Sequence, residues 1–164
     1  MHLLATEEYG LRCLLQVARC SSESGDRQLT IQEIAAAEGM TPVYAGKIMR
    51  ALREGGLVSS TRGASGGYRL ARSADSITPW DVIQVLGGSM FPESFCETHP
   101  GARTDCVHSP DCSIRALWRR AESAVEQVLA SVTLADLRSS ESTMVTLLDP
   151  RLPAQGEVAT GLER

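Results

Sequence analysis

The chain has few aromatic residues and no long apolar run. Phe, Trp and Tyr make up 4% of its 164 residues, and Ala, Leu and Val supply much of the other apolar content, a composition typical of helices. No stretch approaches the roughly 20 apolar residues of a membrane-spanning helix. The first residues carry Glu7 and Glu8 and no basic leader, so we expect no signal peptide and a cytoplasmic protein.

The chain also lacks the features of a disulfide-bonded protein and of a uniformly basic nucleic-acid binder. Its five cysteines are an odd number and accompany no export signal, which argues against a disulfide framework. Its net charge is −4. The apolar fraction of 43% argues against global disorder, and 164 residues suit one domain, or a small domain with an oligomerisation element.

The charge is unevenly distributed along the chain. Between Thr41 and Arg72, six basic residues accompany one acidic residue, Glu54, whereas seven basic and thirteen acidic residues lie between Ser73 and the C-terminus. A basic block inside an acidic chain is typical of a localised phosphate-binding face. The alternative is an ordinary solvated helix face.

Three helices are predicted in the first 54 residues. An apolar stripe at helical period predicts the first helix over residues 6–20. Thr30 and Glu33 have the spacing of a capping box, which begins a short second helix that stops at Gly39. Thr41-Pro42 begins a third helix that runs to about Glu54. Two helices joined by a tight glycine-containing turn form a helix-turn-helix. The third helix is expected to bury Val43, Ile48, Met49 and Leu52.

A β-hairpin is predicted directly after these helices. Residues 57–61 and 68–70 have the alternation and β-branched content of strands, and the glycine-rich residues 63–67 form the tip. A hairpin in this position is the wing of a winged helix-turn-helix. The predicted fold class is therefore mainly α with a small β-hairpin wing, a winged helix-turn-helix domain followed by a long dimerisation helix.

The second half of the chain divides into a helix, a loop, a long helix and a tail. Thr78-Pro79 opens a helix closed by Gly87-Gly88, and residues 90–111 form a long loop with little periodicity. From Cys112 onwards, apolar residues at i, i+3, i+4 and i+7 predict a long dimer helix, with packing on the N-terminal domain as the alternative. Order is expected to fade after Asp136. The predicted units are a winged helix-turn-helix domain at 1–88, a cysteine-rich loop at 89–112, a dimerisation helix at 113–138 and a flexible tail at 139–164.

The third helix and the hairpin tip carry the predicted DNA contacts. The N-terminal residues of a recognition helix reach base edges in the major groove. We expect Lys47 to read guanine or hold a phosphate, and Arg50 to hold the backbone. Small residues around Arg62 allow the tip to approach the duplex and Arg62 to enter a minor groove. The alternative is a winged helix used for protein contacts. The predicted DNA-binding residues are Thr41, Val43, Lys47, Arg50, Arg62 and Ser65.

Several strings of residues resemble one family of bacterial regulators. Leu57-Val58-Ser59-Ser60-Thr61-Arg62-Gly63, followed by Gly66-Gly67-Tyr68, closely resembles the wing of IscR/NsrR-type regulators. Tyr9-Gly10-Leu11-Arg12 and the string from Leu29 to Ala35 are similar to the same family, so the resemblance covers about residues 1–135. It implies a homodimeric transcription regulator that binds an inverted-repeat operator in double-stranded DNA, with Arg62 in the minor groove. The family includes members without clusters, so a metal needs its own argument.

Three of the cysteines share one loop. Cys96, Cys106 and Cys112 offer soft thiolate ligands that suit an iron–sulfur cluster or zinc, and a metal would order a long loop with few apolar residues. Cluster-binding relatives carry three cysteines in this loop. The gap from Cys106 to Cys112 matches theirs, but Cys96 lies several residues further away. The resemblance implies an iron–sulfur cluster, with 2Fe–2S favoured and 4Fe–4S as the alternative.

Three cysteines leave one position of such a cluster open. In some relatives a residue near position 8 of the partner subunit fills it, and Glu8 stands there; the histidine used by other relatives falls at Arg115, which cannot ligate. His99 and His108 are local alternatives, as are water and a small thiol. Charge stabilisation of a helix N-terminus would also explain Glu8. A ligand from the partner implies that cluster loss, nitrosylation or a redox change shifts operator affinity.

Two cluster-free alternatives keep the same fold. A thiol switch would pair cysteines without metal, and a zinc site would use His99 or His108 as nitrogen ligands.

Cys13 and Cys20 lie in the first predicted helix and are expected to be small buried hydrophobes. The sequence shows no nucleotide-binding glycine loop and no nucleophile–base set, so we do not expect an enzyme.

Overall fold

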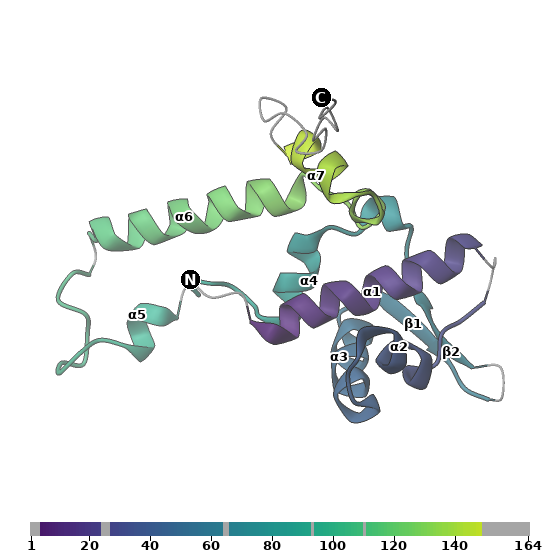
Figure 1. Cartoon of the computed structure of the whole chain (residues 1–164). Helices are drawn as coiled ribbons and strands as arrows, with labels where there is room; N and C mark the ends of the chain where they lie inside the picture. The colour runs from purple at the N-terminus through teal and green to yellow at the C-terminus, as the bar shows by residue number, and fades with distance from the viewer. Residues whose placement is uncertain (1–3, 24–26, 64–65, 93, 110, 149–164) are drawn as a thin grey trace, which may run out of the picture.

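The computed structural model describes residues 4–23, 27–63, 66–92, 94–109 and 111–148. It confirms a mainly helical chain with one β-hairpin. Figure 1 shows α1–α4 and the hairpin gathered in one body, with α6 reaching away from it toward α5. The helices are α1 (Ala5–Glu23), α2 (Ile31–Glu38), α3 (Pro42–Glu54), α4 (Pro79–Leu86), α5 (Phe95–Thr98), α6 (Ser113–Ala130) and α7 (Glu141–Leu148), with 3₁₀ turns η1 (Ala74–Ser76) and η2 (Asp136–Arg138).

Local capping chemistry places the two helices of the helix-turn-helix. The Thr30 hydroxyl accepts the Glu33 amide at 3.3 Å, and the Glu33 carboxylate accepts the Thr30 amide at 2.9 Å, which confirms the predicted capping box. After α2, Gly39 adopts a left-handed conformation with φ 65°, a conformation that favours glycine. Thr41 then caps α3 and Pro42 occupies its first turn.

The wing is the antiparallel pair β1 (Val58–Thr61) and β2 (Gly67–Leu70), with Ser59 opposite Arg69 and Ser60 opposite Tyr68. An isolated bridge between Leu29 and Tyr68 ties the hairpin to the segment before α2. A Cβ at Gly67 would lie 2.7 Å from the Leu29 carbonyl oxygen, so this close approach requires glycine.

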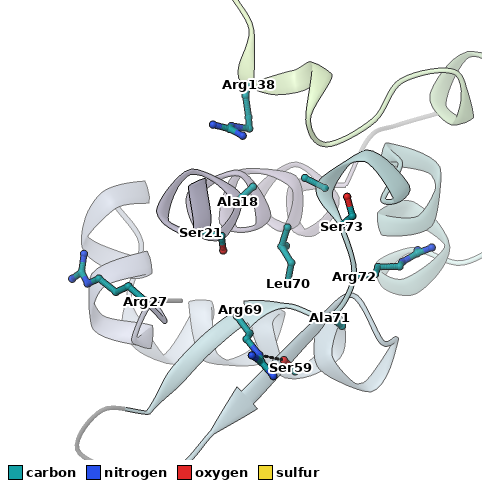
Figure 2. Close-up of a pocket in the computed structure, with 11 residues that line it drawn as sticks. Ala18, Ser21, Arg27, Ser59, Arg69, Leu70, Ala71, Arg72, Ser73 and Arg138 are labelled. Carbon is teal, nitrogen blue, oxygen red and sulfur yellow. Dashed lines mark hydrogen bonds between the residues drawn. The ribbon is translucent and has the colours of Figure 1, made fainter. Parts of the chain in front are cut away.

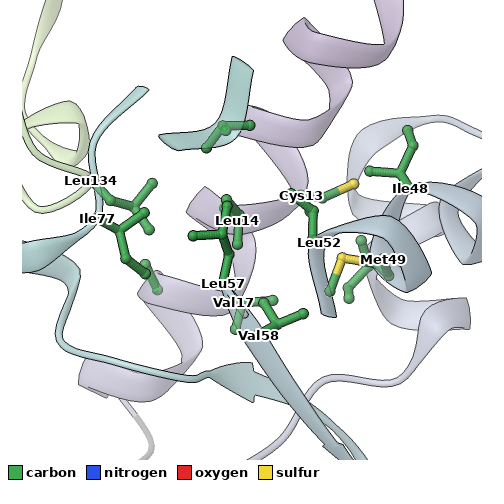
Figure 3. Packing of buried hydrophobic residues seen from close by; sticks show 13 residues of the cluster. Cys13, Leu14, Val17, Ile48, Met49, Leu52, Leu57, Val58, Ile77 and Leu134 are labelled. Atoms are coloured by element: carbon green, nitrogen blue, oxygen red, sulfur yellow. The ribbon is translucent and has the colours of Figure 1, made fainter. Parts of the chain in front are cut away.

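The core is formed around α1. Figure 3 shows Leu14 and Val17 among side chains from α3, the hairpin and the segment after α6. Leu134 is buried in this core, and its backbone amide donates to the Ile77 carbonyl at 2.7 Å. The end of α6 is thereby anchored to the winged helix-turn-helix body, whereas the helix itself extends from it.

Cys13 and Cys20 are buried in α1, as predicted. Burial, together with the smaller effect of the nearby Glu38 carboxylate, raises the pKa of the Cys13 thiol to about 12. The Cys13 thiol therefore stays protonated at neutral pH and packs as a small apolar group.

Three predictions were wrong in detail. Val43 is 72% exposed, because the buried positions of α3 are 45, 48, 49 and 52, and residue 43 lies off that stripe. The loop at 90–111 contains the short helix α5. Order does not fade after Asp136: the Asp136 carboxylate accepts the Thr133 amide at 2.9 Å, and η2 and α7 follow. Residues 149–164 lie outside the described part.

Candidate functional site

The outward face of α3 carries the predicted base-reading residues. Val43 and Lys47 are exposed one turn apart, opposite the stripe that packs on the core. Thr41 is also exposed, but its hydroxyl already accepts the Tyr44 amide at 3.3 Å as the helix cap. The geometry therefore gives Thr41 a structural role and leaves Val43 and Lys47 accessible to a duplex.

Arg50 has a partner on its own helix. Its Nε donates to the Glu54 carboxylate at 2.8 Å, and this hydrogen bond raises the pKa of Arg50 and lowers that of Glu54. Both side chains are exposed, and a guanidinium has further N–H donors. A DNA phosphate would consequently share the N–H donors of Arg50 with Glu54, or compete with Glu54 for them.

The wing presents Arg62 at its tip, where it is exposed beside Gly63. The strand end next to the tip is braced, because the Thr61 hydroxyl donates to the Gln28 side-chain oxygen at 2.6 Å. Ser65, the other predicted wing contact, lies outside the described residues. α3 and the wing thus place Lys47 and Arg62 on two exposed elements of one body (Figure 1).

A groove of about 890 Å³ lies between α1, the hairpin and η2 and is lined by four arginines. Figure 2 shows Arg27 and Arg72 directed away from the groove. Arg27 pairs with Glu33, and Arg72 pairs with Asp81 at 2.9 Å. Arg69 donates to the Ser59 hydroxyl at 3.2 Å. The guanidinium groups therefore do not converge, and the groove is not a built anion site.

The three loop cysteines line one small cavity. Its volume is about 140 Å³, and Trp118 from α6 forms part of its wall. Within the described residues, no three His, Cys, Asp or Glu side chains are grouped closely enough to hold an ion. Glu8 is exposed in the first turn of α1 and does not line this cavity. The lining residues are Phe91, Phe95, Cys96, His99, Cys106, His108, Cys112, Ile114, Arg115 and Trp118.

Helix ends position two of the cysteines. Cys112 is the N-cap of α6, and its sulfur accepts the Arg115 amide at 3.4 Å. Cys96 lies in α5, between Phe95 and the helix end at Thr98. Arg115 also lines the cavity. The cysteines are free thiols in this arrangement.

An aromatic row holds His99 at the cavity. The Phe95 and His99 rings stack with centroids 4.4 Å apart and an interplanar angle of 17°, and Phe91 packs on Phe95 at 5.1 Å. His99 Nδ1 lies 3.1 Å from the Phe95 carbonyl oxygen and 2.9 Å from the Thr98 hydroxyl. The sequence alone presents His99 and His108 as equivalent candidate ligands in this loop. The spacing of residues 91, 95 and 99 by four is the signal that could have indicated this row.

Comparison with known proteins identifies the family. The model of the Rrf2 family, described as iron-dependent transcriptional regulators, matches residues 4–140. The chain belongs to the Rrf2 family. Protein rrf2 of Nitratidesulfovibrio vulgaris is 35% identical over 142 residues, which cover 87% of this chain and 90% of that protein. CymR of Bacillus subtilis is 34% identical over 139 residues, covering 85% and 91% respectively.

Solved structures agree with this assignment. The structure of CymR, the global cysteine regulator of B. subtilis, has a TM-score of 0.65 at 31% identity and covers 84% of this chain and 96% of CymR. IscR of T. potens has a TM-score of 0.63 at 30% identity, covering 84% and 85%. This Rrf2-family chain is therefore a DNA-binding transcription regulator and not an enzyme. Among its described residues, no helix combines the length and the apolar character that crossing a bilayer requires.

Proposed function

We propose that this Rrf2-family chain acts as a homodimer whose affinity for an operator is set by an iron–sulfur cluster on Cys96, Cys106 and Cys112. The observation that carries the proposal is that all three cysteines line one cavity between α5, the following loop and α6, so a cluster would have to draw their thiols closer together. The description of the family as iron-dependent and the similarity to IscR support it.

The donor set fits such a cluster. Three thiols and two imidazoles surround the cavity, and these are the soft and borderline ligands that iron–sulfur centres take. When bound, the cluster would supply one-electron redox chemistry and reactivity toward nitric oxide. Phe91, Phe95 and Trp118 contribute an apolar part to the cavity wall. The 2Fe–2S form stays the favoured prediction and 4Fe–4S the alternative.

The fourth ligand has two candidate protein sources, and water, a small thiol or no ligand is the remaining alternative. Glu8 would have to come from the partner subunit, because it does not line the cavity of its own chain. A histidine of the same loop would need no partner. Glu8 would link the cluster directly to the other subunit's DNA-binding domain, whereas a loop histidine would act through α6.

DNA recognition is proposed to use α3 and the wing. Val43 and Lys47 would enter the major groove, Arg62 and Ser65 would contact the adjacent minor groove, and Arg50 would hold the backbone. Thr41 would contribute mainly as the helix cap. α6 would connect the cluster to DNA binding, because Leu134, just beyond α6, is fixed to the DNA-binding body.

A cluster-free switch is the second candidate function. The three cysteines are free thiols in one loop region, and CymR is described as a cysteine regulator. The same donors could form a disulfide or, with a histidine, bind zinc. Both forms would be colourless.

Anaerobic purification with a visible spectrum and assays of iron and sulfide tests the proposal. Wild-type protein is expected to be brown with equal iron and sulfide, and C106S is expected to lose both. C20A is the matched control, because Cys20 is buried in α1 away from the cavity. Operator sites selected from random duplexes should bind cluster-loaded and cluster-free protein with different affinity. Colourless wild-type protein that also resists reconstitution would overturn the cluster and favour the second candidate.

A further inference from the structure

His99 is the one loop histidine whose ring is fixed by its surroundings. Its ring stacks on Phe95, which packs on Phe91, so two aromatic contacts in series restrict its rotation. His108 also lines the cavity, and both histidines are exposed, but within the described residues no hydrogen bond or ring contact holds the His108 imidazole. The two histidines are therefore not equivalent as ligands.

The contacts around His99 favour one of its tautomers. A carbonyl oxygen only accepts, so the 3.1 Å contact between Nδ1 and the Phe95 oxygen is a hydrogen bond only if Nδ1 carries the proton. The Thr98 hydroxyl is compatible with this assignment, because it can donate to the Ser94 carbonyl at 3.1 Å while accepting from Nδ1 at 2.9 Å. The opposite tautomer would place two acceptors, Nδ1 and the Phe95 oxygen, against each other.

A protonated Nδ1 leaves the lone pair of a neutral imidazole on Nε2. Metal-binding histidines commonly donate their other ring N–H to a backbone carbonyl, which fixes the ring and raises the basicity of the ligating nitrogen. Here the Phe95 carbonyl is placed to accept that outer hydrogen bond from Nδ1, on a side chain that lines the same cavity as the three cysteines. Glu8 lies outside this cavity in its own chain.

We infer that His99, through Nε2, is the fourth protein ligand of the cluster, beside Cys96, Cys106 and Cys112. The inference rests on the proposed function, and it completes the ligand set within a single chain. It also assigns Phe95 a positioning role, because its carbonyl orients the imidazole and its ring supports it.

Pulsed electron paramagnetic resonance of the reduced cluster tests this ligand, using protein labelled with ¹⁵N at histidine. Wild-type protein should show a strong coupling to an imidazole nitrogen. H99A should lose this coupling. A chelator should also remove iron from H99A about tenfold faster than from wild-type protein. H108A and E8A, which change the other candidate ligands, should retain both.

A cysteine replacement keeps the test independent of folding. H99C should retain the cluster, because it supplies a thiolate, but with no nitrogen coupling and a lower reduction potential. A brown wild-type protein without nitrogen coupling, or a coupling that persists in H99A, would overturn this inference and leave the proposed function standing. Loss of the coupling in H108A would also overturn it. Iron-free wild-type protein would overturn both.

Discussion

At the scale of single residues, the recognition face shows why two neighbouring basic side chains are not equivalent. Lys47 and Arg50 are both exposed on α3, but Arg50 is held by Glu54 one turn away. Within the described residues Lys47 forms no ion pair, so its charge is available to DNA without competition. An exposed ion pair contributes little to stability. The main effect of Glu54 is therefore to neutralise part of the Arg50 charge that would otherwise attract a DNA phosphate.

Replacing Lys47 is therefore expected to weaken operator binding more than replacing Arg50. K47A should lower the affinity by roughly tenfold or more, and should reduce the slope of log affinity against log salt by about one if Lys47 holds a phosphate. R50A should lose less, and E54Q should strengthen binding slightly by releasing Arg50. R120A is the matched control, because it removes one positive charge from α6. Fluorescence anisotropy over a salt series gives both quantities, and equal losses in K47A and R50A would contradict this account.

At the scale of elements, reciprocal threonine–carboxylate hydrogen bonds cap α2 and α4 and also form in the turn that leads into η2. The pairs Thr30 with Glu33, Thr78 with Asp81 and Thr133 with Asp136 share one geometry. Hydrogen bonds from the Thr30 backbone and hydroxyl lower the pKa of Glu33, and those from the Thr133 hydroxyl and backbone lower the pKa of Asp136. Burial raises the pKa of Asp81, but hydrogen bonds from Thr78 and the Arg72 charge outweigh it and lower the pKa overall.

A lowered pKa makes the contribution of Glu33 depend on pH in a defined direction. The stabilisation is fully present above the pKa of Glu33 in the unfolded chain and is lost as the pH falls through its lower folded value. E33Q should therefore be less stable than wild type at neutral pH, and the difference should shrink under acid conditions. E126Q, at an exposed position of α6, is the control. Urea unfolding at several pH values measures the difference, and a constant gap between wild type and E33Q would contradict the cap.

These elements also show what the sequence could and could not predict. The Thr30–Glu33 box, Pro42 and the glycine-rich hairpin are local signals, so α2, α3 and the wing were predicted close to their bounds. The helix α5 is only four residues long, too short for a periodic pattern. The outward direction of Val43 depends on the phase of the buried stripe, which packing against α1 decides. The presence of three cysteines in one loop was visible, but the hydrogen bond that distinguishes His99 from His108 needs coordinates.

At the scale of the whole molecule, α6 carries an apolar stripe that its own chain leaves largely uncovered. Leu117 is 62% and Trp118 51% exposed, and Ile114 and Val128 are similarly exposed. Figure 1 shows α6 reaching away from the DNA-binding body, to which Leu134 fixes its end. A contiguous apolar face of this kind is unfavourable in water, so we propose that a second copy of the chain covers it.

Placing a charge on this stripe should separate the two copies. L117E is expected to have the mass of one 17.6 kDa chain in light scattering where wild type has that of two, because burying an unpaired carboxylate in an apolar interface is costly. Q127E is the matched control, since it adds the same charge outside the stripe.

The helical content of L117E should be unchanged, because Leu117 contributes little to the core of its own chain. Its operator affinity should fall by at least about tenfold, since one copy can engage only one half-site and the gain from linking two sites is lost. An L117E protein that stays dimeric, or a monomeric wild type that binds the operator fully, would contradict this role of α6.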